Sequence, residues 1–258
     1  MKNIKIIAVL AAILLPLVAW AGDNDAGLTV GVAAEKKFNK KASVELEAEF
    51  RSRNNLRTAD RVSLGLTGAY KITRWLKADA GYQLLIDNNH EKISYNPSTI
   101  DDDGNEVVNY NNWRPSYWGT RHRVFASLTG SYKIGRVELS LRERWRYTYR
   151  PERTVTRYDF DNEQWEDKLI ATKHSHMLRS RFKVDWDIPN WKFDPWASVE
   201  LFNNWSLQKV RYAVGADYSL RKKHVFGVYY RFQDMCGDED DDDEGNLHTI
   251  GLSYKFKF

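Results

Sequence analysis

Alternation of apolar and polar side chains with a period of two is the feature that most constrains the fold of this chain. Between residues 42 and 53, apolar side chains occupy every second position from Ala42 to Phe50, and Glu or Arg fills most positions between them. No helix produces this pattern, because a helical face repeats every 3.6 residues. The segment therefore predicts a β-strand with one apolar and one charged face.

The same alternation returns along most of the remaining chain. Further strands are expected within residues 61–71, 76–84, 121–133, 137–147, 178–186, 198–201, 209–218, 226–233 and 249–258, and residues 28–38 would add an eleventh. Because bacterial single-chain barrels have an even number of strands, ten or twelve is the expected number. A soluble β-sandwich also alternates, but its core seldom accepts charge at every second residue. The sequence predicts an all-β fold, a single transmembrane antiparallel β-barrel of about 10–12 strands.

The connections between these segments alternate between short and long. Short turns fall near residues 39–40, 73–74, 135–136, 189–190 and 221–222, whereas residues 88–117, 151–172 and 234–246 make longer connections. Short periplasmic turns and long extracellular loops are typical of outer-membrane barrels. A mean hydropathy of −0.62 together with 14% aromatic residues also fits a barrel, whose outer face is apolar while its lumen and loops are polar.

The N-terminus has the features of a secretory signal. Lys2 and Lys5 precede a short apolar stretch, and Ala-Trp-Ala at residues 19–21 matches a cleavage site. We expect residues 1–21 to be a signal peptide and residues 22–258 to form the barrel domain. The apolar stretch is too short for a confident membrane-spanning helix.

The C-terminal strand ends in alternating aromatic residues, Tyr254, Phe256 and Phe258. This ending resembles the signal by which the barrel-assembly machinery recognises its substrates. We therefore expect location in the bacterial outer membrane, with outer-membrane lipid and the barrel-assembly machinery as partners. Nucleic acid is not an expected partner, because a net charge of +4 is small and the basic residues are spread along the strands.

Charged residues on the predicted lumen face are sorted along the barrel. On strands that rise from short turns, acids come before arginines, as Glu45 and Glu47 come before Arg51, and on descending strands the order reverses. The outer half of the lumen should hold an arginine belt, with carboxylates nearer the periplasm and the nearest acids by sequence toward the opposite end. The belt comprises Arg51, Arg53, Arg121, Arg123, Arg142, Arg144, Arg179 and Arg181.

Two interpretations of this belt remain open. Guanidinium groups bind carboxylate and phosphate bidentately, so the belt could bind a small anionic solute. Alternatively, the arginines and acids form a salt-bridged filling that rigidifies a narrow barrel, because barrels near eight strands fill with side chains.

Other polar clusters suggest alternative chemistry. His174 and His176 share one face of a strand while Ser175 points the other way, which argues against a serine nucleophile with a histidine base. Residues 101–106 and 238–244 are acidic and could hold calcium, but neither segment matches the full calcium-loop pattern, and a run of charge is more often a solvated loop. We assign no catalytic residue, no metal ligand and no cofactor.

Two single residues stand apart from the pattern. Cys236 is the only cysteine, which excludes an internal disulfide and a cysteine-based metal cluster, and an incidental thiol explains it. Glu143 falls on the lipid-facing phase near mid-strand, where a carboxylate is unfavourable. It is expected to be protonated, to mark a subunit contact or to lie at a local bulge.

Several short motifs together carry a family resemblance. They are Glu35-Lys36-Lys37-Phe38, the strand from Glu45 to Arg51, Tyr70-Lys71, Gly81-Tyr82, Arg121-His122-Arg123, Leu141-Arg142-Glu143-Arg144 and the ending Tyr254-Lys255-Phe256-Lys257-Phe258. With them the chain resembles a DUF-class bacterial outer-membrane β-barrel family, one whose function is not established. The resemblance covers essentially residues 22–258 and implies fold and location, but no activity.

For function, the sequence favours a porin-like, non-enzymatic barrel that binds or transports small solutes, with a leaning toward anions. The alternative is an outer-membrane enzyme acting on lipid or lipopolysaccharide. A scaffold that recognises partners through its long loops is a third hypothesis.

Overall fold

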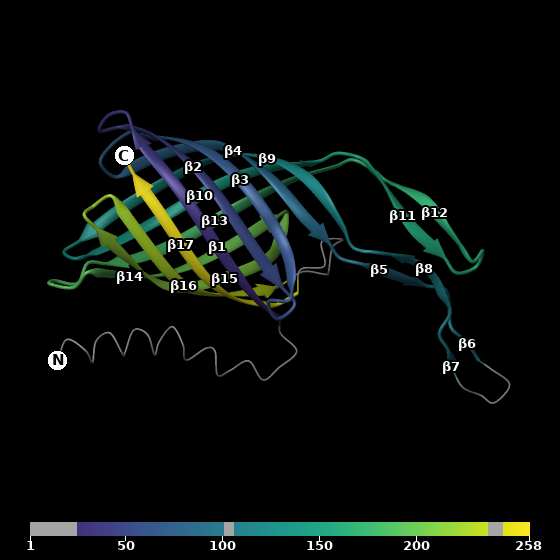
Figure 1. The fold of residues 1–258 in the computed structure, drawn as a ribbon. Helices are drawn as coiled ribbons and strands as arrows, with labels where there is room; N and C mark the ends of the chain where they lie inside the picture. Colours follow the sequence, from purple (N-terminus) through teal and green to yellow (C-terminus); the bar gives the residue numbers. More distant parts are fainter. Residues whose placement is uncertain (1–24, 101–105, 237–244) are drawn as a thin grey trace.

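The computed structural model describes residues 25–100, 106–236 and 245–258, and a closed β-barrel dominates it (Figure 1). None of these residues belongs to a helix long and apolar enough to span a membrane. The barrel strands are β1 (Asp25–Lys37), β2 (Ala42–Arg53), β3 (Thr58–Lys71), β4 (Leu76–Asn89), β9 (Tyr117–Ile134), β10 (Val137–Arg150), β13 (Lys173–Trp186), β14 (Phe193–Asn204), β15 (Ser206–Leu220), β16 (His224–Met235) and β17 (Leu247–Lys257).

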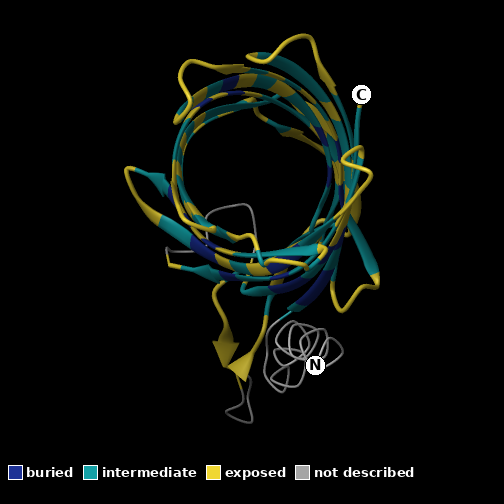
Figure 2. Ribbon diagram, turned by 90° about the vertical axis from the view of Figure 1, so that its left-hand side faces the viewer, coloured by how far each residue is buried: buried dark blue, intermediate teal, exposed yellow. Residues whose placement is uncertain are grey.

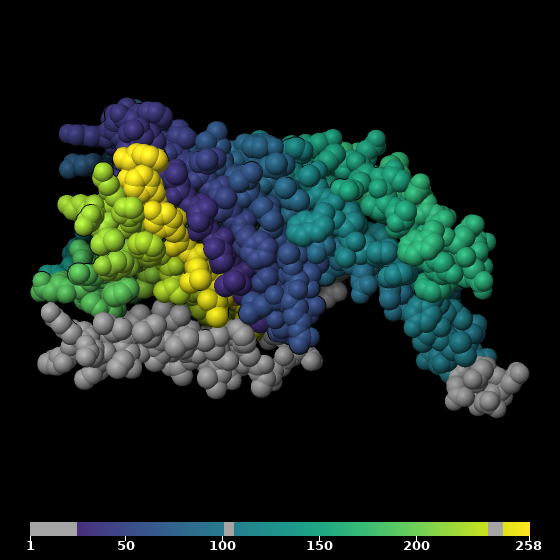
Figure 3. Space-filling view, in the orientation of Figure 1, coloured from purple at the N-terminus to yellow at the C-terminus, as the bar shows by residue number. Residues whose placement is uncertain are grey.

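The barrel closes between its first and last strands. β1 and β17 lie side by side (Figure 3). They pair in parallel, in register from Asp25 opposite Leu247 to Glu35 opposite Lys257. Eleven strands lie within the expected range, but the expectation of an even number is wrong. Strands that alternate in direction leave the first and last of an odd set pointing the same way, so the closing pair must be parallel. Every other neighbouring pair in the barrel is antiparallel.

The apolar and polar residues that alternate in the sequence lie on the outer and inner faces of the barrel wall, respectively. Apolar side chains such as Leu46, Leu66 and Leu141 are more than half exposed on the outside of the barrel. Exposed and less exposed residues consequently alternate along the wall (Figure 2). An apolar outer face with a polar interior is the arrangement of a transmembrane barrel.

Glu143 lies on this outer face, as its phase in the strand indicates. Its carboxylate accepts a hydrogen bond of 2.6 Å from the Ser180 hydroxyl on β13. The register of β10 with both neighbours is unbroken at this residue, so the expected explanation of a local bulge is wrong.

Two long connections carry strands of their own beyond the end of the barrel. The sequence marks residues 88–117 and 151–172 only as long connections, whereas the structure forms β5 (Lys92–Tyr95), β8 (Tyr110–Arg114), β11 (Arg153–Asp159) and β12 (Gln164–Ile170) within them. These four strands make a separate sheet, and β6 (Thr99–Ile100) pairs with β7 (Glu106–Val107) further out. We call these strands the extension, and the barrel end from which they project the mouth (Figure 1).

The C-terminus lies at the barrel end opposite the mouth, where it continues the pairing with β1 (Figure 1). The Phe258 amide donates a 2.9 Å hydrogen bond to the Glu35 carbonyl of β1, and the rings of Phe256 and Phe258 meet edge to face.

The expected signal peptide, residues 1–21, lies outside the described residues and stays a prediction.

A substitution at Gly251 tests how tightly the side chains of the wall pack. It lies opposite Tyr229 in the β16–β17 ladder, and a Cβ atom there would come within 1.9 Å of the tyrosine ring. We expect Gly251→Ala to displace that ring and to lower the free energy of unfolding by about 1–3 kcal/mol, the usual cost of overpacking. Urea titration of the refolded barrel measures this loss.

Gly130→Ala is the matched control, because a Cβ atom at Gly130 would meet nothing within 4 Å. The control should unfold at the urea concentration of the unmodified barrel. Equal loss of stability in the two variants would contradict the proposed contact between Gly251 and Tyr229.

Candidate functional site

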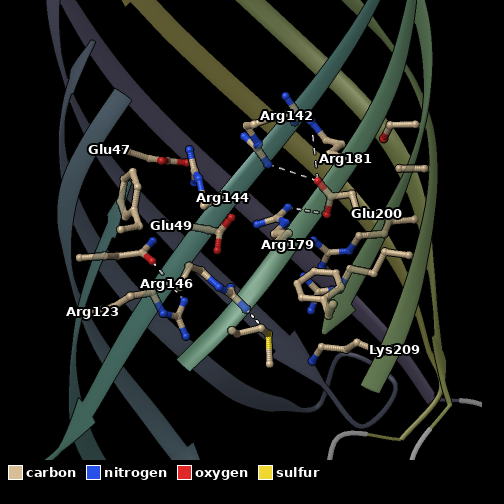
Figure 4. A pocket seen from close by; sticks show the side chains of 18 of the residues that line it. Glu47, Glu49, Arg123, Arg142, Arg144, Arg146, Arg179, Arg181, Glu200 and Lys209 are labelled. Atoms are coloured by element: carbon tan, nitrogen blue, oxygen red, sulfur yellow. Dashed lines mark hydrogen bonds and ion pairs between the residues drawn. The ribbon is translucent and has the colours of Figure 1, made fainter. Parts of the chain in front are cut away.

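A cavity of about 450 Å³ occupies the barrel interior, and cationic side chains dominate its wall (Figure 4). The thirteen cationic residues that line it are Arg51, Arg61, Arg121, Arg123, Arg142, Arg144, Arg146, Arg179, Arg181, Arg211, Arg231, Lys183 and Lys209. The four acidic residues are Glu47, Glu49, Glu200 and Asp217. The lining therefore carries a large excess of positive groups.

Strand register explains why the arginines gather. In the β10–β13 ladder Arg142 lies opposite Arg181, and Arg144 lies opposite Arg179. Directly opposed residues point to the same face of a sheet, so two rows of guanidinium groups enter the lumen together. Residues two positions apart in a strand point to the same face, so each row of arginines continues along its own strand.

Glu200 of β14 holds three of these arginines. Its carboxylate accepts hydrogen bonds from Arg179 and, at 3.5 Å, from Arg142. The Arg181 Nε atom lies 3.8 Å away. Only 9% of the Glu200 side chain is exposed, so its charge is shared almost entirely with arginines. One carboxylate thus compensates a cluster of three cations.

Two aspartates of β4 pair with further arginines of the lumen. Asp87 contacts both Arg61 and Arg121, the second at 2.6 Å. Arg144 donates to Asp79 at 2.9 Å. The expectation that the carboxylates lie nearer the periplasm is wrong for Asp87, which lies at the mouth end of β4. Pairing between strands brings these acids to arginines that are far apart from them in the sequence. The salt-bridged interpretation therefore describes part of the belt.

Arg146 and Arg123 have partners other than carboxylates. Arg146 contacts the Met177 sulfur at 2.6 Å, and its guanidinium lies over the Phe202 ring. Arg123 donates to the hydroxyl of Thr148 and to the side-chain oxygen of Gln83. Within the described part of the chain, neither guanidinium has a carboxylate partner. The positive charge of these two groups is therefore not compensated by an ion pair within the described residues.

The predicted belt and the observed cavity overlap but are not identical. Seven of the eight predicted arginines line the cavity, whereas Arg53 lies at the mouth, 3.2 Å from Asp60. The belt omitted Arg61, Arg146, Arg211 and Arg231, although each lies on the lumen-facing phase of its strand. The sequence pattern could have included them.

Phe202 is a lining residue that sequence reasoning missed. Its side chain is 1% exposed, and the cationic groups of Arg146, Arg179, Lys209 and Arg211 lie 4.7–5.4 Å from its ring. A register shift between Phe202 and Asn203 interrupts the ladder there. Cation–π contacts of this kind hold cationic groups in place without neutralising them.

The His174-Ser175-His176 segment spans both faces of the wall. Ser175 lines the cavity. His174 faces outward, where its Nδ1 atom lies 2.6 Å from the Tyr147 hydroxyl, and His176 stacks on Trp145. The prediction that serine and histidines point apart is confirmed, so the segment does not assemble a serine nucleophile with its base.

Metal binding has no support in the described ranges, which contain no group of three or more His, Cys, Asp or Glu side chains placed to hold an ion. Residues 101–105 and 237–244, which include most of both acidic segments, lie outside these ranges. Calcium binding by the acidic segments remains a sequence prediction.

A closed barrel with an apolar outer face and a charged lumen defines a transmembrane β-barrel. Residues 30–243 match the family described as "Protein of unknown function (DUF2490)", and the chain belongs to this family. The predicted resemblance to a family of unestablished function is thereby confirmed. Among curated proteins, none matches the chain.

Among solved structures, the chain matches several with low similarity. The beta domain of the Bordetella autotransporter BrkA is 13% identical with a TM-score of 0.46, covering 83% of this chain and 78% of its own. The NanC porin is 11% identical with a TM-score of 0.46, covering 91% of this chain and 98% of its own. The CymD monoaromatic hydrocarbon channel is 8% identical with a TM-score of 0.41, covering 78% and 66%.

Loss of the Glu200 charge should destabilise the lumen. Glu200→Gln keeps the side-chain volume but leaves the three neighbouring arginines without their shared carboxylate. Removing one partner of a buried ion pair costs about 3–5 kcal/mol. We expect a loss of this size in the free energy of unfolding, measured by urea titration.

Glu47→Gln is the control, since it makes the same chemical change in the same cavity at a residue with no ion pair among those described. It should cost much less stability. If the two variants lose the same free energy, Glu200 does not hold the arginine cluster.

Proposed function

We propose that this protein is a non-enzymatic outer-membrane barrel that binds small anions in its arginine-lined cavity and lets them cross the membrane. The observation that carries the proposal is the lining of thirteen cationic and four acidic residues. Arg123 and Arg146 support it further, because the described residues offer neither of them a carboxylate. An anion in the cavity would supply that missing charge.

Physical chemistry favours an anion over a neutral solute. Charges in a confined cavity with low-dielectric walls create a stronger potential than the same charges in water. Guanidinium groups also match the geometry of carboxylate and phosphate, to which they donate two parallel hydrogen bonds. Carboxylate or phosphate compounds are therefore the proposed class of solute.

The proposed location follows from the two surfaces of the wall. The exposed apolar face suits contact with outer-membrane lipid. Phe256 and Phe258 lie at the barrel end opposite the mouth, where we propose that the barrel-assembly machinery recognises them. Non-enzymatic action is part of the proposal, since Ser175 and the two histidines beside it lie on opposite faces.

Deletion of Phe258 tests location and assembly together. We expect the unmodified protein in the outer-membrane fraction, with different migration in SDS before and after boiling, because folded barrels unfold reluctantly. The truncated chain should be secreted normally but inserted in smaller amounts, as measured by immunoblotting of outer-membrane fractions. Normal insertion without Phe258, or unmodified protein found soluble in the periplasm, would contradict this part of the proposal.

Replacement of Arg146 and Arg123 tests the anion site. Arg146→Gln should weaken binding of inorganic phosphate to the detergent-solubilised barrel by about tenfold, the effect of losing one charge-assisted interaction. Isothermal titration calorimetry measures this affinity. In planar bilayers, the double variant with Arg123→Gln should show a lower anion preference, read from the reversal potential in a salt gradient.

The control for both measurements is Arg74→Gln, which removes one positive charge from an exposed turn at the far end of the barrel. It should leave affinity and reversal potential unchanged. Absence of phosphate binding would overturn the binding proposal, and a cation preference or a lack of conductance would overturn transport.

A further inference from the structure

A second cationic cavity lies at the mouth, between the barrel rim and the base of the extension. Its volume is about 290 Å³, and we call it the vestibule. Barrel strands contribute Arg61, Arg121 and Arg150, and the extension contributes Lys92, Arg114 and Lys168. The vestibule therefore exists only because the extension folds as a sheet above the rim.

The acids of the vestibule are already engaged by barrel arginines. Asp87 pairs with Arg61 and Arg121, and Asp60 pairs with Arg53 at 3.2 Å. These are the only two carboxylates among the described lining residues. The positive charges of the extension and of Arg150 at the end of β10 therefore join a lining whose two acids already pair with other arginines.

Arg150 is the least satisfied group in this cavity. Its Nε atom is buried without a hydrogen-bond partner, and its guanidinium makes no hydrogen bond or ion pair with any described residue. The Nε atom of Arg114 is likewise buried without a partner, although another nitrogen donates to the His90 carbonyl at 3.1 Å. Buried donors of this kind are normally paired, which points to an acceptor from outside the chain.

The vestibule adjoins the central cavity. Arg61 and Arg121 line both spaces. Along β10, Arg142, Arg144 and Arg146 line the central cavity, and Arg150 continues the same lumen-facing phase into the vestibule. At 3.4 Å per residue, this row is about 27 Å long, far longer than one phosphate or carboxylate group.

We propose that the vestibule is a second anion-binding site and that the ligand is an extended anionic chain, carrying several phosphate or carboxylate groups, which occupies both cavities at once. This inference rests on the proposed binding of anions in the central cavity and names the class of anion. A chain that reaches both sites binds the second one intramolecularly, so its affinity exceeds that of a single anion without any new type of contact.

Chain length is the decisive variable in the test. Linear polyphosphate and polyglutamate, each in short and long forms, are titrated against the detergent-solubilised full-length barrel by calorimetry, with inorganic phosphate as the single-anion probe. We expect affinity per chain to rise at least about tenfold when the chain becomes long enough to span both cavities. If affinity rises with the length of either polymer, the proposal is supported and the preferred anionic group is identified. If affinity rises with neither polymer, the proposal is overturned.

Variants locate the two contacts. Arg150→Gln should weaken binding of the long chain by about tenfold while leaving inorganic phosphate binding in the central cavity unchanged. Arg146→Gln should weaken both, and Arg74→Gln should weaken neither. Arg114→Gln repeats the vestibule test if Arg150→Gln does not give the heat-modifiable migration of a folded barrel.

The outcomes separate this inference from the proposed function. If the long chain binds the Arg150 and Arg114 variants as tightly as the unmodified barrel while Arg146→Gln still weakens phosphate binding, the vestibule proposal fails and the central anion site stands. If inorganic phosphate does not bind the unmodified barrel, the proposed central site fails.

Discussion

Closure of the sheet by the parallel pairing of β1 and β17 is the constraint on which the other features depend. In the hydrocarbon core of a membrane, each backbone amide and carbonyl must find a partner within the protein. An open edge strand would leave a row of such groups unpaired. The register from Asp25 opposite Leu247 to Glu35 opposite Lys257 removes that edge, at the cost of one parallel pair among antiparallel ones. Closure also gives the wall an inside, so alternation along each strand separates a lipid-facing surface from an enclosed lumen.

Enclosure decides the electrostatics of the lumen. Arginines on neighbouring strands, such as Arg142 and Arg181, point side by side into the same enclosed lumen, where less water can solvate them than on an open sheet. Glu200, Asp79 and Asp87 each hold one or more of them. Eleven strands lie between the barrels of about eight, which side chains fill, and the much wider porins. The result is an interior in which salt bridges and a cationic cavity coexist, so the two interpretations of the belt describe different arginines of one cluster.

The extension changes the character of one barrel end. β5, β8 and β12 place Lys92, Arg114 and Lys168 above the rim, where they enlarge the positive region of the lumen toward the mouth. Its sheet is held by cross-strand aromatic contacts, including Tyr158 with Trp165 across β11 and β12 at a ring separation of 5.4 Å. Aromatic pairs of this kind stabilise short strands that have no barrel to close them.

Much of the wall could be predicted from the sequence, and the residues show why. Leu46, Leu141 and Glu143 lie on the outer face that their phase predicts, because side-chain direction in a strand depends only on position parity. Seven of the eight belt arginines reach the cavity for the same reason. The pairing of Arg144 with Asp79 could not be predicted, since it depends on which strands lie next to each other and in which register.

The sequence by itself therefore determined the fold class, the face that each wall residue presents and the arginine content of the lumen, because these depend on local periodicity. Only the tertiary structure decided that eleven strands close through a parallel pair, that Glu200 serves three arginines and that Arg123 and Arg146 have no described carboxylate partner. It also decided that two long connections fold into a sheet above the mouth. These features arise from contacts between segments far apart in the chain, and the geometry that brings such segments together is set by closure of the whole barrel rather than by any local pattern.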